Sequence, residues 1–440
     1  MRINSLFFVS LLGASGFAHA ADLLETFRAA QSSDPVFASA RASQQVGQEK
    51  LPQGRALLMP TVNLSAASTF NDNNIQYLGK TIFPGGNYRY NNNGYNLSLS
   101  QPLFRWQNWL AYNEAELQVA QTEAQFRLAE QDLVLRTAQA YFDVLIAQDS
   151  VQLAAAQKNA ITEQLAQAKR NFEVGTATIT DSQEAQARFD LTRAQEIAAQ
   201  NNLEIKQRML QQLTNTSPAV LKRLGKTFKL LSPQPANMDK WIEDAQLNNP
   251  QLAIAQAMTQ LADKEVERYR AAHYPTLDLV ANYGRNYANG GTFGVGTDSR
   301  NTNVGVQLNI PLFQGGAVDS KWREAEGNRE RAKAELENAR RTVATQTSLA
   351  YLGVVSGIAQ VQALQQALTS SESLLEASKL GQEVGVRTNL DVLNAQQQLF
   401  ATRRDLYQAQ YNYLLSQLRL RAAAGALGEG ELAQVNQALY

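Results

Sequence analysis

The 440-residue sequence contains no cysteine and only two histidines, His19 and His273. Without cysteine the chain cannot form disulfides, thiolate metal sites or a cysteine nucleophile. His19 lies in a segment that we expect to be removed, so the mature chain keeps one imidazole, too little for most acid–base or transition-metal chemistry. His273 precedes Tyr274-Pro275 with no further residues at ligand spacing, and we interpret it as structural. These absences predict a protein that is not an enzyme and needs no cofactor or metal.

An excess of charge and a long apolar run are also missing. Lys and Arg together number 40, as do Asp and Glu, so the formal net charge is zero. Because phosphate backbones attract concentrated basic residues, nucleic acid is not expected as a partner. Beyond the N-terminus no stretch approaches 18 consecutive apolar residues, so we expect no transmembrane helix.

The N-terminus has the pattern of a secretory signal peptide. Arg2 is followed by an apolar run, Leu6–Leu12, and then by Ala18-His19-Ala20, the charged, hydrophobic and cleavage-site parts of such a peptide. The run is too short to anchor the chain in a bilayer as a helix. We therefore expect export of a chain that begins at Ala21, either as a periplasmic or secreted protein or as an outer-membrane β-barrel.

The chain contains two copies of one unit, recognisable from motifs that recur at an offset of 209 to 215 residues. The matching motifs are Asp34-Pro35 and Asn249-Pro250, Pro60 and Pro275, Pro102-Leu103-Phe104 and Pro311-Leu312-Phe313, Tyr141 and Tyr351, Val174-Gly175 and Val384-Gly385, and Asp181 and Asp391. The predicted organisation is a signal peptide at 1–20, a first repeat at 21–213, a linker or equatorial segment at 214–238, a second repeat at 239–424 and a C-terminal tail at 425–440.

Two segments in each repeat alternate apolar and polar residues, which predicts strands at 60–71 and 94–102 and at 275–286 and 302–311. The apolar faces consist of Val62, Leu64, Ala66, Ser68 and Phe70; Tyr95, Leu97 and Leu99; Leu277, Leu279, Ala281 and Tyr283; and Val304, Val306, Leu308 and Ile310. One apolar face over about ten residues is typical of a transmembrane barrel, although a surface sheet of a soluble domain has the same alternation.

Prolines mark the predicted junctions between helices and strands, namely Pro60, Pro102, Pro275 and Pro311. Proline cannot continue a helix interior, so the helices predicted at 22–58 and 238–272 end before Pro60 and Pro275. The Asn- and Gly-rich connections between the strands are longer than ordinary hairpin loops, as in outer-membrane barrels. Aromatic residues at both strand ends fit two membrane interfaces: Phe70, Tyr95 and Tyr283 at one end, and Phe104, Trp106, Trp109 and Phe313 at the other.

A helix of roughly 100 Å is predicted at 108–172, where proline and glycine are absent, with a counterpart at 315–382. Shorter helices are predicted at 181–213 and 391–424. The first long helix carries two apolar seams on nearly opposite sides: Leu117, Ala124, Leu128, Leu135, Ala138, Phe142 and Leu145, and Val119, Phe126, Leu133, Ala140, Val144, Ala147 and Val151. Two seams favour a single-layered wall of helices over an ordinary antiparallel coiled coil, which needs only one.

Four strands per chain cannot close a barrel, and an open sheet edge in lipid leaves unpaired backbone groups that cost several kcal/mol each. Two chains would supply eight strands, whose interior is filled by side chains, whereas three would supply twelve and leave an aqueous lumen. We therefore expect a homotrimer in outer-membrane lipid, with the polar strand faces lining a pore.

Together these features resemble the TolC family of outer-membrane channel proteins. The resemblance covers essentially the whole mature chain and is sharpest at 172–181 (FEVGTATITD), at 383–393 (EVGVRTNLDVL) and at 411–415 (YNYLL). It implies an α+β membrane protein, a trimer in which four strands per protomer complete a 12-stranded outer-membrane β-barrel that continues as a long periplasmic coiled-coil α-helical barrel. It also implies docking to a periplasmic adaptor (membrane fusion) protein and an inner-membrane ABC or RND-type transporter, for drug efflux or type I protein secretion.

The two Val-Gly breaks predict helix hairpins at the periplasmic tip, about 100 Å from the barrel by helix length. Gly175 and Gly385 end the long helices, as C-terminal caps do. Thr180-Asp181 and Asn389-Leu390-Asp391 offer capping side chains for the helices that follow. Ordinary turn chemistry suffices to explain both glycines.

The resemblance implies that the second hairpin lines the tunnel entrance. By position, Arg387 would be a latch with Thr180 and Asp181 of the first hairpin as its acceptors. Gln382 stands where some members of the family carry an aromatic latch partner, so this part of the latch is in doubt.

By the same resemblance, Asp391 would supply a ring of three carboxylates that selects cations. Some members place a second aspartate one turn later, where this chain has Asn394, so a weaker cation filter is expected. The alternative for Arg387 and Asp391 is an exposed i, i+4 pair of little consequence.

The predicted function is a passive exit duct for a tripartite efflux pump or a type I secretion system. The alternative is a periplasmic coiled-coil adaptor or scaffold without a membrane part. The transported substrate, protein or small molecule, and the choice of pump are left open.

Overall fold

The computed structural model describes residues 21–82, 85–216, 220–225 and 228–439, so the expected signal peptide lies outside the described residues. The described chain divides into two compact units. One unit comprises 21–40, 127–249 and 342–439, and the other comprises 41–126 and 250–341. Each unit therefore draws on both sequence repeats.

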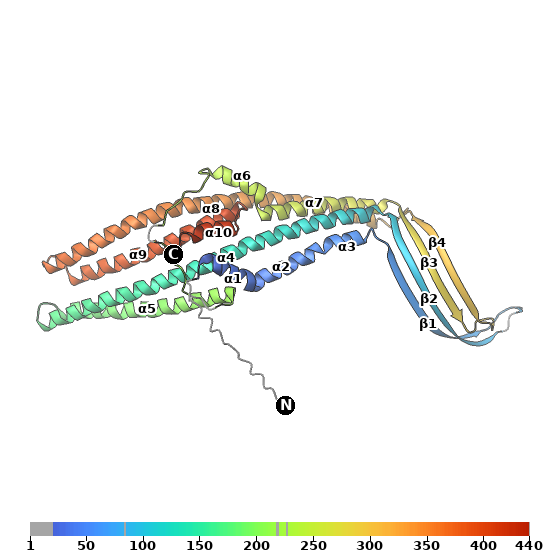
Figure 1. Ribbon diagram of the computed structural model, residues 1–440, viewed down its shortest axis with the longest axis horizontal. Coiled ribbons are helices and arrows are strands. Elements are labelled where there is room, and N and C mark those ends of the chain that lie inside the picture. Colours follow the sequence, from blue (N-terminus) through green and yellow to red (C-terminus); the bar gives the residue numbers. More distant parts are fainter. Residues whose placement is uncertain (1–20, 83–84, 217–219, 226–227, 440) are drawn as a thin grey trace, which may run out of the picture. The chain divides into compact units, whose positions relative to one another are not determined.

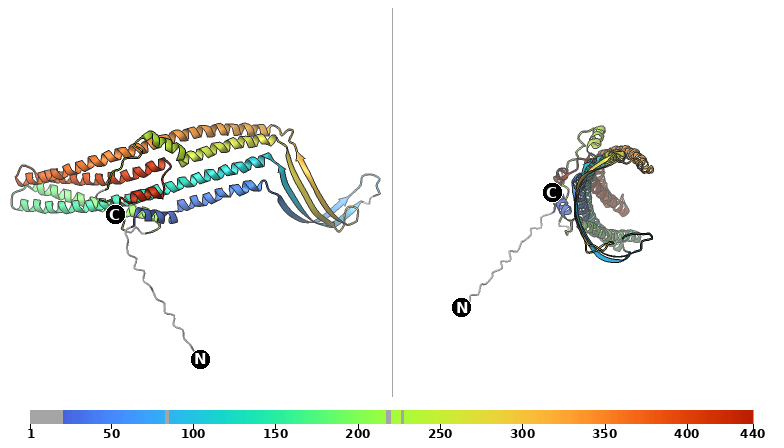
Figure 2. Two further views of the ribbon diagram at one scale, coloured as in Figure 1. Left: turned by 45° about the horizontal axis from the view of Figure 1, so that its top comes forward. Right: turned by 90° about the vertical axis from the view of Figure 1, so that its right-hand side faces the viewer.

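A four-stranded antiparallel sheet lies in the second unit, with strand order β1-β2-β3-β4 (Figure 1). The strands are β1 (Thr61–Ile75), β2 (Gly86–Phe104), β3 (Thr276–Ala288) and β4 (Thr297–Asn309). They extend further toward the connections than expected, because the Asn-rich segments continue the ladder instead of forming loops. One reason is cross-strand pairing of polar side chains, such as Arg89 Nε with Asp72 Oδ2 at 3.0 Å. The sheet is curved, as Figure 2 shows.

The pairing register places the predicted apolar faces of the four strands on one side of the sheet. Directly opposed residues of an antiparallel pair project to the same side, so each row of partners shares a face. Apolar and polar rows alternate along the strands, and three consecutive rows are Val62, Leu99, Ala281 and Val304; Asn63, Ser98, Asn282 and Asn303; and Leu64, Leu97, Tyr283 and Thr302. One face is therefore apolar and the other is lined by Asn and Ser.

Five helical segments accompany the sheet in this unit. They are part of α2 (Pro35–Gln48), α3 (Lys50–Ala56), the start of α4 (Trp106–Glu173), α7 (Pro250–Arg270) with the short 3₁₀ segment η1 (Ala271–His273), and the start of α8 (Ala317–Glu383). Gly54 lets α3 approach α4 closely, since a Cβ at this position would lie 2.7 Å from the Cβ of Ala115.

Helix pairs make up most of the other unit. The remainder of α4 runs beside α5 (Ile179–Thr214), and the remainder of α8 runs beside α9 (Asn389–Ala423) (Figure 1). Shorter helices α1 (Leu23–Ser33), α6 (Met238–Asn248) and α10 (Glu429–Asn436) also belong to this unit. The expected C-terminal tail thus contains a helix, α10, which is tied to α1 by the ion pair between Arg28 and Glu429.

The expectation of one helix at 22–58 and one at 238–272 was wrong. The first region forms α1, α2 and α3, and the second forms α6 and α7. Helix α1 ends at Asp34, whose carboxylate accepts the backbone N–H of Phe37 at 3.0 Å and so starts α2. Pro35 and Pro250 each stand at the first position of the new helix, where a missing N–H is harmless. The residue before a proline disfavours helical dihedrals, which explains both breaks.

Tyrosine side chains of α4 and α9 form hydrogen bonds with the segment at 214–238. The hydroxyl of Tyr141, fully buried, donates to the carbonyl of Lys222 at 2.8 Å. The hydroxyl of Tyr413 donates to the carbonyl of Leu231 at 2.9 Å and accepts its N–H at 2.7 Å. The segment expected as a linker at 214–238 is thereby held against α4 and α9.

In the described residues, one helix, α8, contains an 18-residue window apolar enough to cross a membrane by length and composition. The criterion of consecutive apolar residues missed it because Gln, Ser and Thr interrupt the window. At 67 residues, α8 is far longer than the roughly 20 needed for a span, and its composition fits a helix in a protein wall equally well.

Candidate tunnel entrance and membrane sheet

Both helix hairpins have the same backbone geometry at the end of the long helix. Gly175 and Gly385 each adopt φ = +79°, a left-handed conformation that glycine tolerates without strain. After α4, the N–H of Gly175 donates to Phe172 O at 3.0 Å and the N–H of Thr176 donates to Asn171 O at 2.8 Å. These two bonds form a Schellman motif, and the same pair of bonds recurs after α8.

Each following helix begins with a capping box. The Thr178 hydroxyl accepts the N–H of Asp181 at 3.2 Å, while Asp181 Oδ2 accepts the N–H of Thr178 at 2.9 Å and its hydroxyl at 2.7 Å. Thr388 and Asp391 repeat these contacts at the same three distances. The capping residues are thus Thr178 and Thr388, with the aspartates in reciprocal contact.

Of the residues expected to offer capping side chains, Asp181 and Asp391 take part in the caps, whereas Thr180 and Asn389 do not. Helices α5 and α9 begin at Ile179 and Asn389, two residues before their predicted starts. The T-x-x-D spacing, present in both repeats, is the signal that would have placed the caps correctly.

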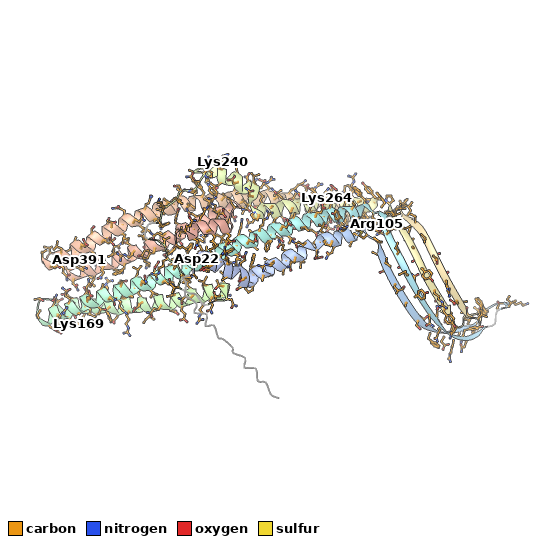
Figure 3. All side chains as sticks on the ribbon, viewed as in Figure 1. Asp22, Arg105, Lys169, Lys240, Lys264 and Asp391 are labelled. Atoms are coloured by element: carbon orange, nitrogen blue, oxygen red, sulfur yellow. The ribbon has the colours of Figure 1, made fainter. Side chains whose placement is uncertain are left out.

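Asp391 uses its two carboxylate oxygens differently. Oδ2 belongs to the capping box, whereas Oδ1 lies 3.8 Å from Nη1 of Arg387. Hydrogen bonds from the backbone N–H and the hydroxyl of Thr388, with Arg387 nearby, hold the pKa of Asp391 below its ordinary range despite some desolvation. This carboxylate is exposed and ionised at neutral pH. Figure 3 shows Asp391 at the end of the α8/α9 pair and Lys169 near the end of the α4/α5 pair.

Arg387 is half exposed and packs over a glycine. In the described part of the chain its one ion pair is with Asp391, and neither Thr180 nor Asp181 contacts it. A Cβ at Gly381 would lie 2.6 Å from Arg387 Cγ, so Gly381 makes room for the arginine stem. Gln382, at the position of the expected latch partner, donates to Asn389 Oδ1 at 3.4 Å.

Asn394 has a partner that the sequence did not indicate. Arg188 on α5 donates through Nη2 to Asn394 Oδ1 at 3.0 Å and through Nη1 to Gln397 Oε1 at 2.6 Å. These contacts join the two hairpin pairs. No local pattern predicts them, because the residues lie more than 200 positions apart in the sequence.

The prolines at the sheet base occupy different places in the strands. Pro60 and Pro275 directly precede β1 and β3, and Pro311 follows β4. Pro102 was expected to end its strand, but β2 continues to Phe104 through an irregularity in register between these two residues. The missing N–H of proline weakens the ladder at this point, which accounts for the shift.

An ion pair and a histidine–aspartate contact lie at the junctions at this end of the sheet. Arg105, immediately after β2, forms a bidentate pair with the buried Asp278 of β3, with Nε–Oδ1 at 2.8 Å and Nη2–Oδ2 at 2.6 Å. His273 Nε2 lies 3.3 Å from Oδ1 of Asp319 on α8, a contact that fits a structural histidine. Within the described ranges no cluster of three or more His, Cys, Asp or Glu could hold a metal ion.

The apolar face of the sheet is strongly exposed in the isolated chain. Leu64 is 71% exposed and Val304 is 73% exposed, and aromatic residues at both ends of the strands, such as Phe70 and Phe313, are exposed as well. A contiguous exposed apolar surface of this kind marks contact with a membrane or with other protein.

Paired helix hairpins and a sheet with one apolar and one polar face are features of an outer-membrane channel class of protein. The family described as Outer membrane efflux protein matches residues 27–216 and 241–426, and the chain belongs to this family. The expected TolC-like α+β fold, the exit-duct function in efflux or type I secretion, the outer-membrane location and the absence of enzyme activity are confirmed by this membership and by the relatives below.

Among curated relatives, the Outer membrane protein TolC of Escherichia coli (strain K12) is 33% identical over 441 residues, covering 98% of this chain and 87% of that protein. The Alkaline protease secretion protein AprF of Pseudomonas aeruginosa is 33% identical, covering 97% and 88%. Among solved structures, the Campylobacter jejuni CmeC outer membrane channel has a TM-score of 0.81 at 16% identity, covering 100% and 98%. None of these is a periplasmic adaptor or scaffold.

Proposed function

We propose that three copies of this chain close a twelve-stranded β-barrel in the outer membrane and form a helical tunnel whose entrance is built by the hairpins. The observation that carries the proposal is the register of the sheet. It aligns four apolar stripes on one face and Asn and Ser on the other, as expected for a lipid-facing exterior and a water-filled lumen.

The sheet edges supply the reason for assembly. In the described chain β1 and β4 each pair with one strand only, so each presents unpaired backbone groups. Such groups cost several kcal/mol each in lipid, and a neighbouring copy is the partner that satisfies them. Three copies, with twelve strands, leave a lumen wide enough for water, whereas eight strands would be filled by side chains.

Engineered cysteines test this closure cleanly because the chain has none of its own. Cells would co-express Asn63→Cys on β1 with single cysteines on β4 at Asn301, Asn303 or Gly305, all on the polar face. At least one combination should give a disulfide-linked dimer. Ser98→Cys on the central strand β2 is the matched control and should give none with any β4 cysteine. Absence of every β1–β4 link, together with a monomeric protein that carries no current in planar bilayers, would overturn the proposal.

At the entrance, Arg387 acts as a latch that closes the resting tunnel. Its guanidinium makes no hydrogen bond within the described residues and lies 3.8 Å from Asp391, so its donors are available to Thr180 and Asp181 of a neighbouring hairpin. Asp391 supplies one carboxylate per chain to a cation-selecting ring, and Asn394 leaves the next turn uncharged. Single-channel recording of variants at Arg387 and Asp391 tests these two roles separately.

The tunnel docks to a periplasmic adaptor and an inner-membrane ABC or RND-type transporter. The names of the relatives support this, since AprF is an alkaline protease secretion protein and the family is that of outer membrane efflux proteins. A photoreactive cross-linker on Gln183→Cys, an exposed site two residues after the capping Asp181 at the α4/α5 turn, should capture an adaptor that mass spectrometry then identifies. Leu247→Cys on α6, also exposed, is the control away from the hairpins. Equal capture at both sites would contradict docking at the hairpins.

Residues 1–20 direct export and are cleaved from the chain in that process. Ala21, the expected first mature residue, is held in place: its N–H donates to Val220 O at 2.8 Å and its carbonyl accepts the N–H of Lys222 at 3.2 Å. N-terminal sequencing of protein from the outer membrane should begin at Ala21, and a sequence beginning at Met1 would refute cleavage.

A further inference from the structure

Arg188 is the point at which the hairpin of the first repeat is tied to the hairpin of the second. Its guanidinium reaches from α5 to α9 and donates to two amide oxygens, at 2.6 Å to Gln397 and at 3.0 Å to Asn394. Asn394 and Gln397 lie three positions apart on α9, so both amides project from one face of the helix. The planar fork of arginine matches two such acceptors, as a lysine would not.

No other hydrogen bond joins α5 to α9 among the residues that the structure describes. Near the tip, one apolar cluster lies within the first helix pair: Leu165 and Ala168 of α4 pack with Ala185 of α5, and Phe189 lies against them. The hydrogen-bonded tie between α5 and α9 is therefore made by Arg188. It depends on one side chain, placed seven residues after the capping Asp181.

We propose that Arg188 is a positioning residue of the entrance, a clamp that holds the α8/α9 hairpin against the α4/α5 hairpin within one protomer. This inference rests on the proposed function, in which the hairpins form the entrance. Arg188 acts separately from Arg387, because it uses different acceptors and bridges the pairs inside a single chain. Asn394 is then an acceptor for the clamp. Its amide is neutral, whereas an aspartate at this position would be charged, and this neutrality keeps the clamp reversible.

The reversibility follows from the chemistry of the acceptors. A guanidinium held by neutral amides is bound by hydrogen bonds alone, whereas a carboxylate at Asn394 would add a charge-assisted pair that is roughly twice as strong. Opening of the tunnel requires the pairs to separate, and the present contacts can exchange for water when they do. The clamp therefore biases the entrance toward its closed form without locking it.

The test compares Arg188→Gln, Asn394→Asp and the control Arg193→Gln in the full-length detergent-purified protein. Arg193 lies five residues further along α5, is exposed and has no hydrogen bond or ion pair in the described residues. Hydrogen exchange of the α9 segment 389–399 is measured first. Arg188→Gln should speed exchange about fivefold, Asn394→Asp should slow it, and Arg193→Gln should leave it unchanged. Arg188→Lys, which keeps the charge without the fork, should fall between wild type and Arg188→Gln.

Single-channel recording of the same proteins is the second measurement. Arg188→Gln should raise the fraction of time spent open about fivefold, and Asn394→Asp should lower it. Unchanged exchange in Arg188→Gln, or an equal effect of Arg193→Gln, overturns the clamp. Changed exchange with unchanged gating supports the clamp and overturns the assignment of the hairpins to the entrance. If the wild type carries no current, the channel proposal fails and exchange alone decides the clamp.

Discussion

Replacing Asp391 by asparagine removes the charge of the proposed carboxylate ring while keeping an oxygen that can accept the capping bonds of Thr388. The charge and the cap must be separated, since Oδ2 of Asp391 accepts hydrogen bonds from both the N–H and the hydroxyl of Thr388. Asp391→Ala would remove the charge and the cap together, and its effect on cation block would be confounded by a loosened hairpin. Asp391→Asn isolates the charge.

The expected size of the effect follows from Coulomb's law. For a trivalent cation held about 8 Å from each carboxylate in water, with screening at physiological salt, one carboxylate changes binding by roughly two- to threefold. Three symmetry-related carboxylates together change it by about ten- to twentyfold. We therefore expect Asp391→Asn to raise the concentration of trivalent cation needed for half-block by at least about tenfold.

The assay is block of single-channel current by a trivalent cation added from the periplasmic side. Asp181→Asn is the matched comparison, because Asp181 makes the same capping contacts at the same distances in the first hairpin. Since Asp181 is also a proposed acceptor of the Arg387 latch, block is compared on open channels of each variant. Asp181→Asn should shift the blocking concentration by less than about twofold. An unchanged blocking curve in Asp391→Asn would remove the carboxylate ring, and equal shifts in both variants would show that block reports general tip charge instead.

The pH dependence of block checks the same carboxylate. Contacts from Thr388 and Arg387 depress the pKa of Asp391, so the group stays ionised until the pH falls below the ordinary aspartate range. Block should therefore persist on acidification to about pH 4 and be lost only as the pH falls through the depressed pKa. Loss of block near pH 6 would assign it to another group.

Three further variants test other parts of the structure. Arg387→Ser should leave the resting channel leakier, with about two- to fivefold higher conductance in planar bilayers, and equal conductance would exclude the latch. Burial raises the pKa of Asp149, although the hydrogen bond from Tyr411 opposes this shift. The folded protein therefore binds this proton more readily than the unfolded chain, and the free energy of unfolding falls as the pH rises through the raised pKa. Asp149→Asn should flatten that slope in melting temperatures measured from pH 4 to 7, whereas an unaltered slope would refute the cause. Gly385→Ala should destabilise the second hairpin by about 1 kcal/mol through its positive φ, seen as faster local hydrogen exchange, with Gly353→Ala in the middle of α8 as the comparison.

Local patterns carried much of the fold. The period-two alternation located all four strands, and the Val-Gly motifs located both hairpins, because these signals arise from contacts within a few residues. The same local chemistry also contains signals for helix boundaries that the predicted helices did not take into account. Asp34-Pro35 and Asn249-Pro250 marked the repeat but also broke the helices, and the T-x-x-D spacing marked the caps.

The sequence by itself determined the repeat, the four strands, the two hairpins and the apolar face of each strand, since these depend on the order of neighbouring side chains. Tertiary structure decided what lies beside what: that β2 pairs with β3 across the two repeats, that four apolar faces coincide, and that Arg188 meets Asn394. These contacts join residues up to some 200 positions apart, and their partners are chosen by packing and register, to which no local pattern refers.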